Sequence, residues 1–336
     1  MNNLMLYPFF SRLFHTLLIL ACSAFSGIAA AQPKVCALYP HLKDSYWLSI
    51  NYGMVDEASR EHIELKVLEA GGYPNQLKQQ QQIKDCIEWG AQAILLGTVS
   101  PNLYQHDLSR LTGEVPVFAT VNHLILDDTQ RSHLKGEVGV DWYWMGYYAG
   151  DYLAKLHPQG SGITHIGLLP GPEQRGGTKP MVQGFYDAIQ RSDIRIDITL
   201  WADNDKELQR NLVQQVIEQP GIDYIVGSAV AIEAAISELR NANKQQQIQL
   251  VSTYLSHGVY RGLLRDRVAF APSDRMVEQG RLSVRQAAHY LRGESYQHHA
   301  APEIAKLTPE TLSEQIIAES LSPSEFRPTF EVKVVE

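Results

Sequence analysis

The chain has 336 residues, of which 20% are charged and 44% are hydrophobic, so it is long enough for two domains and apolar enough to fold. Its formal net charge is -8 at pH 7, which argues against a nucleic-acid-binding protein, because such a protein presents a basic face. Neither property restricts the small molecules that the chain could bind.

Residues 1–31 have the pattern of a secretory signal peptide. Arg12 precedes the apolar run TLLILACSAF, and small residues follow up to a predicted cleavage site before Gln32. An uncleaved anchor is less favoured, because the run is shorter than the ~20 residues of a membrane span. A lipoprotein signal at Cys22 matches the preceding residues poorly. We therefore predict an exported protein with no membrane span after cleavage.

Two cysteines, Cys36 and Cys86, remain in the exported chain. An oxidising compartment permits a disulfide between them. Cys36 lies early in a predicted strand and Cys86 late in a predicted helix, and these ends can meet in an α/β layer. Two buried free thiols fit the sequence equally well, so both alternatives stay open.

Short apolar runs alternate with helical patterns through the first half of the chain. The run VCALYP predicts a strand, and a helix follows near residues 45–61. Next come the run IELKVLEA, a Gln-rich helix in QLKQQQQIKDCIEW, and the runs AILLG and VPVFATV. Apolar runs this short between helices indicate buried parallel strands.

The second half of the chain repeats this order. Its predicted strands are ITHIGLLP, IRIDITLW, IDYIVGS, IQLVSTY and VAFAP. Its predicted helices are KPMVQGFYDAIQR, KELQRNLVQQVIEQ, AIEAAISELRNA and GVYRGLLR. We therefore predict an α/β fold of two similar domains, each with a doubly wound parallel sheet.

Ligands of doubly wound sheets bind beyond the carboxyl ends of the strands. The loops predicted at those ends include HLKDSYW, GGYPN, VDWYW, PGPEQRGG, TYLSHG and APSD. Aromatic residues are concentrated in these loops, which a hinge without a ligand would not require.

Two segments, VGVDWYWMGYYAGDYLAKL and GITHIGLLPGPEQRGGTKPMVQGFYDAI, resemble the start of the second lobe in type I periplasmic solute-binding proteins, the ribose-binding-like kind. The resemblance covers nearly all of the exported chain. It implies a periplasmic protein whose two lobes close on a ligand cleft about a hinge. By likeness to this family, the N-terminal lobe comprises residues 32–140 plus 272–300, and the C-terminal lobe comprises residues 141–271 plus 301–336.

The residues that sugar-binding members use are mostly replaced. Asn122 and His123 stand where the family has an Asp–Arg pair, and Tyr254 stands where it often has Asp. Arg175 still matches an arginine that sugar binders use. The resemblance therefore implies a ligand other than a sugar, which aromatic side chains would contact.

More closely, the chain resembles members that serve the sensing of trimethylamine N-oxide and partner a membrane histidine kinase. The trimethylated nitrogen of this compound carries positive charge, which aromatic faces attract. The resemblance and the loops together predict a ligand site formed by Asp44, Tyr46, Trp47, Tyr73, Trp142, Arg175 and Tyr254. Asp44 or Asp141 would add negative charge, and a Tyr, Trp or Arg donor would bind the N-oxide oxygen.

Several of these residues have a structural alternative. Trp47 shares a predicted helix face with Ile50 and Met54, so it could cap a core. Asp44 equally suits a helix N-cap. Arg175 could instead form a salt link between the lobes.

The sequence predicts no catalytic residue, no metal site and no cofactor. Nucleophile-elbow, P-loop and dinucleotide-binding motifs are absent, and His298 and His299 lack further ligands at metal-binding spacing. We therefore expect a non-enzymatic sensory protein that binds trimethylamine N-oxide and signals to the kinase's periplasmic domain. The main alternative is the solute-binding protein of an ABC transporter for a small amine or sugar.

Overall fold

The computed structural model describes residues 32–173 and 176–333 of the chain. The predicted signal peptide and Arg175 lie outside these described residues. Within the described ranges, no helix is both long and apolar enough to cross a membrane.

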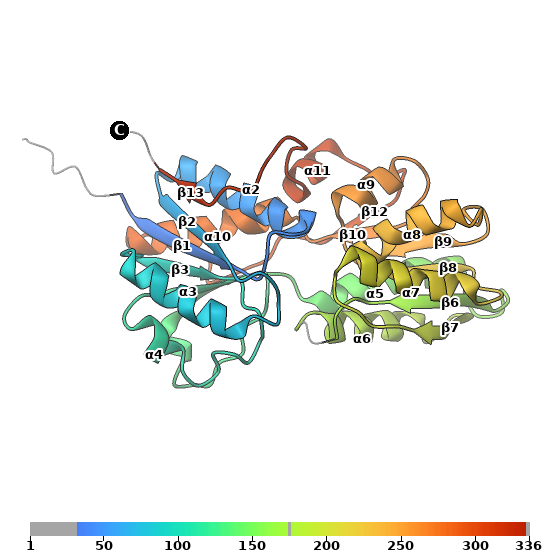
Figure 1. The fold of residues 1–336 in the computed structure, drawn as a ribbon, viewed down its shortest axis with the longest axis horizontal. Coiled ribbons are helices and arrows are strands. Elements are labelled where there is room, and N and C mark those ends of the chain that lie inside the picture. The colour runs from blue at the N-terminus through green and yellow to red at the C-terminus, as the bar shows by residue number, and fades with distance from the viewer. Residues whose placement is uncertain (1–31, 174–175, 334–336) are drawn as a thin grey trace, which may run out of the picture. The chain divides into compact units, whose positions relative to one another are not determined.

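The first sheet is a doubly wound parallel sheet, as predicted. Its strands follow the order β11-β5-β4-β3-β1-β2-β13, and every neighbouring pair is parallel except β13 with β2. Figure 1 labels β3, β1, β2 and β13 of this sheet. The strands are β1 (Lys34–Tyr39), β2 (Glu64–Glu69), β3 (Ala93–Leu96), β4 (Val117–Thr120), β5 (Leu134–Val138), β11 (His299–Ala300) and β13 (Glu331–Val332). The apolar pattern did not reveal β5, because its LKGEV run is polar and only partly buried.

The second sheet repeats this topology with fewer strands. Its order is β7-β6-β8-β9, and all of its pairs are parallel. The strands are β6 (Thr164–Leu169), β7 (Ile194–Thr199), β8 (Tyr224–Gly227) and β9 (Gln249–Ser252). A single parallel bridge from Val251 to Phe270 extends the same order. Both sheets therefore confirm the predicted fold class, and we call the parts built around them the first and second lobes.

The burial of the central strands explains why their apolar runs allowed them to be predicted from the sequence. Every residue of β3, β4 and β8 is buried. A parallel strand that is covered on both faces is apolar at every position rather than at alternate positions. The runs AILL, VFAT and YIVG have that composition, so they form the interior of each lobe.

Helices connect the strands and cover the sheets. They are α2 (Ser45–Arg60), α3 (Gln76–Glu88), α4 (Leu108–Thr112), α5 (Trp142–Leu156), α6 (Thr178–Ile189), α7 (Lys206–Glu218), α8 (Ala229–Asn241), α9 (His257–Leu263), α10 (Met276–Leu291) and α11 (Glu314–Ser320), with a short 3-10 helix, η1 (Arg131–His133). Side chains of Asp44, Asp141, Ser228 and Ser256 accept hydrogen bonds from the first turns of α2, α5, α8 and α9. These caps fix where the helices begin, which matters because several site residues lie in those first turns.

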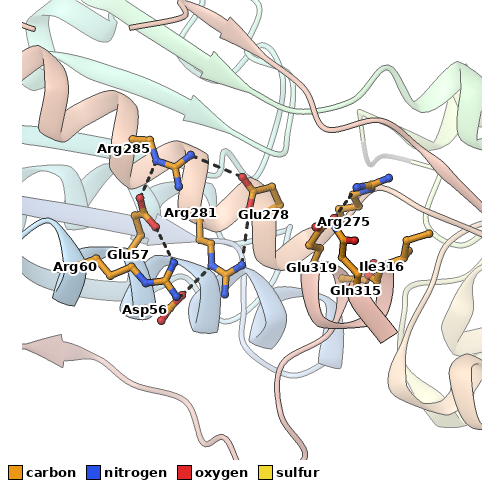
Figure 2. A network of polar contacts seen from close by, with 11 residues as sticks. Asp56, Glu57, Arg60, Arg275, Glu278, Arg281, Arg285, Gln315, Ile316 and Glu319 are labelled. Atoms are coloured by element: carbon orange, nitrogen blue, oxygen red, sulfur yellow. Dashed lines mark hydrogen bonds and ion pairs between the residues drawn. The ribbon is translucent and has the colours of Figure 1, made fainter. Parts of the chain in front are cut away.

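Helices α2 and α10 pack closely in the first lobe. The approach requires glycine at Gly53 and Gly280, because a Cβ at either position would overlap the backbone carbonyl of the opposite helix. Ion pairs then join the two helices along their length (Figure 2). The Nε of Arg281 lies 2.8 Å from Asp56, and the Nε of Arg285 lies 2.8 Å from Glu57.

The cysteines form a disulfide between Cys36 of β1 and Cys86 of α3, with their Cα atoms 5.8 Å apart. Both residues are fully buried. Of the two alternatives that the sequence left open, the structure has the disulfide.

The chain changes lobes through a small antiparallel sheet of β10 (Ala271–Ser273) and β12 (Ala305–Leu307). The prediction that all of residues 301–336 belong to the second lobe is wrong for the end of this segment. Val332 of β13 pairs with Leu65 of β2, so the tail returns to the first sheet. Its polar, short sequence carries no signal for such a distant edge pairing.

Candidate functional site

Three aromatic rings from the two lobes meet at one point. The ring centroid of Tyr46 lies 6.1 Å from that of Trp142 and 5.7 Å from that of Tyr254. The centroids of Trp142 and Tyr254 are 6.0 Å apart. All three side chains are buried. We call this group the aromatic site.

Local structure explains how each ring reaches the site. Tyr46 lies in the first turn of α2, and Trp142 is the first residue of α5. Tyr254 follows β9, and its backbone carbonyl accepts a hydrogen bond of 2.7 Å from the hydroxyl of Ser252. Each ring therefore lies just beyond the carboxyl end of a strand, as the loop rule predicts for ligand sites in this topology.

A buried carboxylate lies directly behind the aromatic site. The Tyr46 hydroxyl donates a hydrogen bond of 2.5 Å to Oδ2 of Asp274, which is fully buried. The side-chain amide of Gln279 donates to the same Oδ2 at 2.8 Å and to the Asp274 backbone carbonyl at 2.8 Å. Asp274 thus places a buried carboxyl group, whose Oδ2 accepts two hydrogen bonds, next to a tyrosine of the site.

Sequence reasoning did not select Asp274. The APSD loop was among the loops at strand ends, but an Asp just before a predicted helix also suits an N-cap. Its hydrogen bond to Tyr46 spans 228 residues of sequence, so no local pattern could reveal it. In the structure Asp274 does not cap α10, because the N-cap residue is Arg275.

Trp47 and Tyr73 extend the aromatic site on the side of the first lobe. The Trp47 ring lies 6.1 Å from that of Tyr46 and 5.4 Å from that of Tyr39. The indole Nε1 of Trp47 donates to the Tyr73 hydroxyl at 3.4 Å. Trp47 is only 1% exposed and belongs to the hydrophobic core, which agrees with its structural alternative, and its contact with a ligand stays a prediction.

A cleft of about 510 Å³ adjoins the aromatic site. Tyr73 and Val99 of the first lobe line it together with Asp141 and Trp142 at the start of α5. Asn122 and His123, which replace the sugar-binding pair, line it as well. The cleft therefore brings Tyr73 and Trp142 together from loops far apart in the sequence.

Gly177 lines the cleft beside Trp142, two residues after the undescribed residues 174–175. A Cβ at this position would lie 2.8 Å from Cγ of the Trp142 ring. The absence of a side chain therefore lets this loop cover Trp142 closely. Arg175, the predicted donor in the same loop, lies outside the described residues.

The two aspartates predicted to contact an amine both cap helices. Asp44 accepts a hydrogen bond of 3.1 Å from the backbone amide of Trp47, and Asp141 accepts one of 2.9 Å from that of Tyr143. Capping does not require a ligand, but Asp141 also lines the cleft. Asp274, by contrast, accepts a hydrogen bond from the hydroxyl of Tyr46, a residue of the aromatic site.

No group of His, Cys, Asp and Glu side chains in the described ranges could hold a metal ion. The arrangement instead presents aromatic faces, hydroxyl groups and a carboxylate. Aromatic faces attract cations, whereas recognition of a sugar depends on several precisely placed polar groups.

Residues 32–327 match the family of periplasmic binding proteins and sugar-binding domains of the LacI family, and the chain belongs to this family. The periplasmic protein TorT of Escherichia coli strain K12 is 48% identical to the chain over 299 residues, which is 88% of this chain and 84% of that protein. The family and this relative confirm the predicted periplasmic location.

Solved structures of similar proteins match the chain over most of its length. A complex of the TorS sensor domain with TorT, without ligand, matches with a TM-score of 0.86 and 65% identity, covering 89% of this chain and all of the matched chain. The corresponding complex in the presence of trimethylamine N-oxide has a TM-score of 0.86 and 66% identity, with the same coverage. An ABC transporter solute-binding protein from Bradyrhizobium with bound bis-tris has a TM-score of 0.77 and 34% identity, covering 90% of each chain. The matched relatives are therefore binding and sensory proteins.

Proposed function

We propose that this protein binds trimethylamine N-oxide at the aromatic site and signals its presence to the periplasmic domain of a membrane histidine kinase. The observation that carries the proposal is the meeting of Tyr46, Trp142 and Tyr254, with ring centroids 5.7 to 6.1 Å apart. At these separations one cation can lie within about 6 Å of all three centroids, the range of cation–π attraction. The similarity to TorT and to its complexes with the TorS sensor domain supports the choice of ligand and partner.

The chemistry of the proposed ligand suits these groups. Its nitrogen carries positive charge spread over three methyl groups, which pack against aromatic faces at a gain of about 0.5–2 kcal/mol per contact. The buried carboxyl group of Asp274 accepts a hydrogen bond from the Tyr46 hydroxyl and holds this ring in place. The N-oxide oxygen needs a donor, which the hydroxyl of Tyr73 or the guanidinium of Arg175 supplies. Asp44 and Trp47 complete the proposed set at the start of α2.

Signalling requires that the ligand bind two states of the protein with different affinities. The rings come from both lobes, so the ligand would favour the arrangement in which the lobes meet. By thermodynamic reciprocity, a kinase domain that favours the same arrangement would raise the affinity for the ligand. We therefore expect a binding partner of the kinase rather than an enzyme.

Calorimetry tests this proposal. The protein purified from the periplasm is titrated with trimethylamine N-oxide, glycine betaine and ribose, alone and with the purified sensor domain of the kinase. We expect binding of the N-oxide that is tighter with the sensor domain, and no binding of ribose. Binding of ribose, or no binding of the N-oxide under either condition, would contradict the proposal.

An ABC-transporter solute-binding protein is the second candidate. The similarity to the Bradyrhizobium solute-binding protein favours it. Such a protein would deliver its ligand to a permease and would not need the sensor domain. Tight N-oxide binding that the sensor domain leaves unchanged, with no association between the two proteins, would favour this alternative.

A further inference from the structure

The second lobe has a basic groove that is separate from the aromatic site. It encloses about 620 Å³ and is lined by α7, α8, α9 and the turn after α9. We call it the arginine groove, defined by Arg240, Arg261, Arg265 and Arg267. In a chain with a formal net charge of -8, this local excess of positive charge is opposite in sign to the whole.

The four arginines of the groove make no side-chain hydrogen bond or ion pair with another residue in the part of the chain that the structure describes, and all four are exposed. The acidic residues of the groove are engaged elsewhere. Glu207 and Glu238 form ion pairs with Arg210, at 3.1 Å and 3.7 Å respectively. The remaining one, Glu233, accepts a hydrogen bond of 2.5 Å from the hydroxyl of Ser256. The groove therefore has six basic side chains against three acidic ones, and its four defining guanidinium groups are exposed to solvent.

Unpaired like charges repel one another, so this cluster does not serve the stability of the fold. Guanidinium groups favour carboxylates, which they bind through paired hydrogen bonds, and arginine is enriched in protein interfaces. Each exposed contact is weak on its own, so useful affinity requires several carboxylates presented together. A face of a folded protein rich in Asp and Glu meets that requirement better than a small anion.

The groove is connected to the aromatic site through α9. Its N-cap, Ser256, is two residues after Tyr254, and the same Ser256 hydroxyl bonds to Glu233 on the wall of the groove. The backbone amide of His257, at the start of α9, donates to the hydroxyl of Ser45 at 3.3 Å, next to Tyr46. A protein bound in the groove would therefore contact a helix that is tied to two rings of the site.

We propose that the arginine groove is the surface on which an acidic face of the kinase's periplasmic sensor domain docks. This inference rests on the proposed function and adds the surface by which the partner is held. It also assigns α9 as the element that links the partner to the ligand.

The test uses the triple variant R261Q/R265Q/R267Q of the protein purified from the periplasm. Association with the purified sensor domain is measured in the presence of trimethylamine N-oxide at about 50 mM and about 300 mM NaCl, where screening lengths differ about twofold. The matched control is K78Q/K84Q/R191Q, which removes the same charge from exposed positions outside the groove. Circular dichroism and thermal unfolding establish that both variants are folded.

We expect the triple variant to bind the sensor domain roughly tenfold more weakly at the lower salt concentration, since three exposed contacts are lost. The difference should shrink at the higher salt concentration, and the control should bind as the parent protein does. Equal binding by the parent protein and the triple variant at both salt concentrations would overturn the docking surface but not the proposed function. A parent protein that does not bind the domain at all would overturn both.

Discussion

Tyr46 brings two separate groups to the aromatic site. Its ring packs against Trp142 and Tyr254, and its hydroxyl bonds to the buried carboxylate of Asp274. The first role needs any aromatic ring, and the second needs the oxygen. Conservative substitutions can therefore separate the effect of the aromatic ring of Tyr46 from the effect of its hydrogen bond to Asp274.

Tyr46→Phe keeps the ring and removes the hydrogen bond to Asp274. A buried carboxylate then loses one donor, which costs about 1–3 kcal/mol of unfolding free energy. Urea unfolding measures this loss, with Tyr186→Phe as the control, because the Tyr186 side chain is exposed and makes no hydrogen bond to another described residue. If the two variants are equally stable, the Tyr46–Asp274 bond does not have the role that the geometry assigns to it.

Trp142→Leu keeps apolar bulk at the start of α5 but removes the aromatic face. The affinity for trimethylamine N-oxide should fall by about 0.5–2 kcal/mol, which is about 2–30-fold. Calorimetry with the sensor domain present measures the change, and Trp201→Leu is the control on an exposed tryptophan of the second lobe. Unchanged affinity in Trp142→Leu would remove this ring from the proposed set.

At the scale of elements, the close packing of α2 and α10 positions the site. Tyr46 begins α2 and Asp274 precedes α10, so the distance between these helices sets the hydrogen bond between the two residues. Gly53 and Gly280 permit the approach, and the ion pairs of Figure 2 hold it. Figure 2 also shows Arg275, the residue after Asp274, directed toward Glu319 of α11. The Nη1 of Arg275 lies 2.5 Å from Oε2 of Glu319.

Gly280→Ala should separate α2 from α10. The new Cβ would overlap the Ile50 carbonyl, a backbone atom that cannot rotate away. Overpacking of this kind costs about 1–3 kcal/mol of unfolding free energy, and the shift should also weaken N-oxide binding. Unfolding and calorimetry measure the two effects, with Ser59→Ala on the exposed side of α2 as the control. A fully stable variant that binds the N-oxide normally would show that the helix spacing does not govern the site.

At the scale of the whole molecule, the disulfide joins two elements of the first lobe that are 50 residues apart in sequence. Closing a loop of this length in the unfolded chain is worth about 4 kcal/mol in the chain-entropy account, at the upper end of the typical range of about 2–4 kcal/mol. The bond lies inside one lobe and does not join the lobes. It should therefore stabilise the fold without limiting the motion of one lobe against the other.

Reduction should lower the unfolding free energy of the parent protein by about 2–4 kcal/mol. The double variant C36A/C86A should be less stable than the oxidised parent and insensitive to the reductant. Urea unfolding with and without dithiothreitol measures both. A parent protein whose stability does not respond to dithiothreitol would argue that the linkage contributes nothing to folding.

The sequence by itself determined the architecture of this protein. Apolar runs such as AILL and YIVG were readable because buried parallel strands are apolar at every position. Their alternation with amphipathic helices indicated two doubly wound sheets, and the topology of such sheets gathers strand-end loops. Tyr46, Trp142 and Tyr254 were therefore predicted together from loops that are far apart in the chain, and the structure brings their rings within 6.1 Å.

Only the tertiary structure decided which polar groups surround those rings. Asp274 in sequence looks like a helix cap, and its contact with Tyr46 depends on the packing of α2 against α10. The pairing of β13 with β2, the choice of a disulfide over two thiols, and the convergence of four arginines in one groove have the same origin. Local periodicity reports which face of an element is buried, whereas the partner of a polar side chain is set by elements that are distant in sequence and meet only in the folded chain.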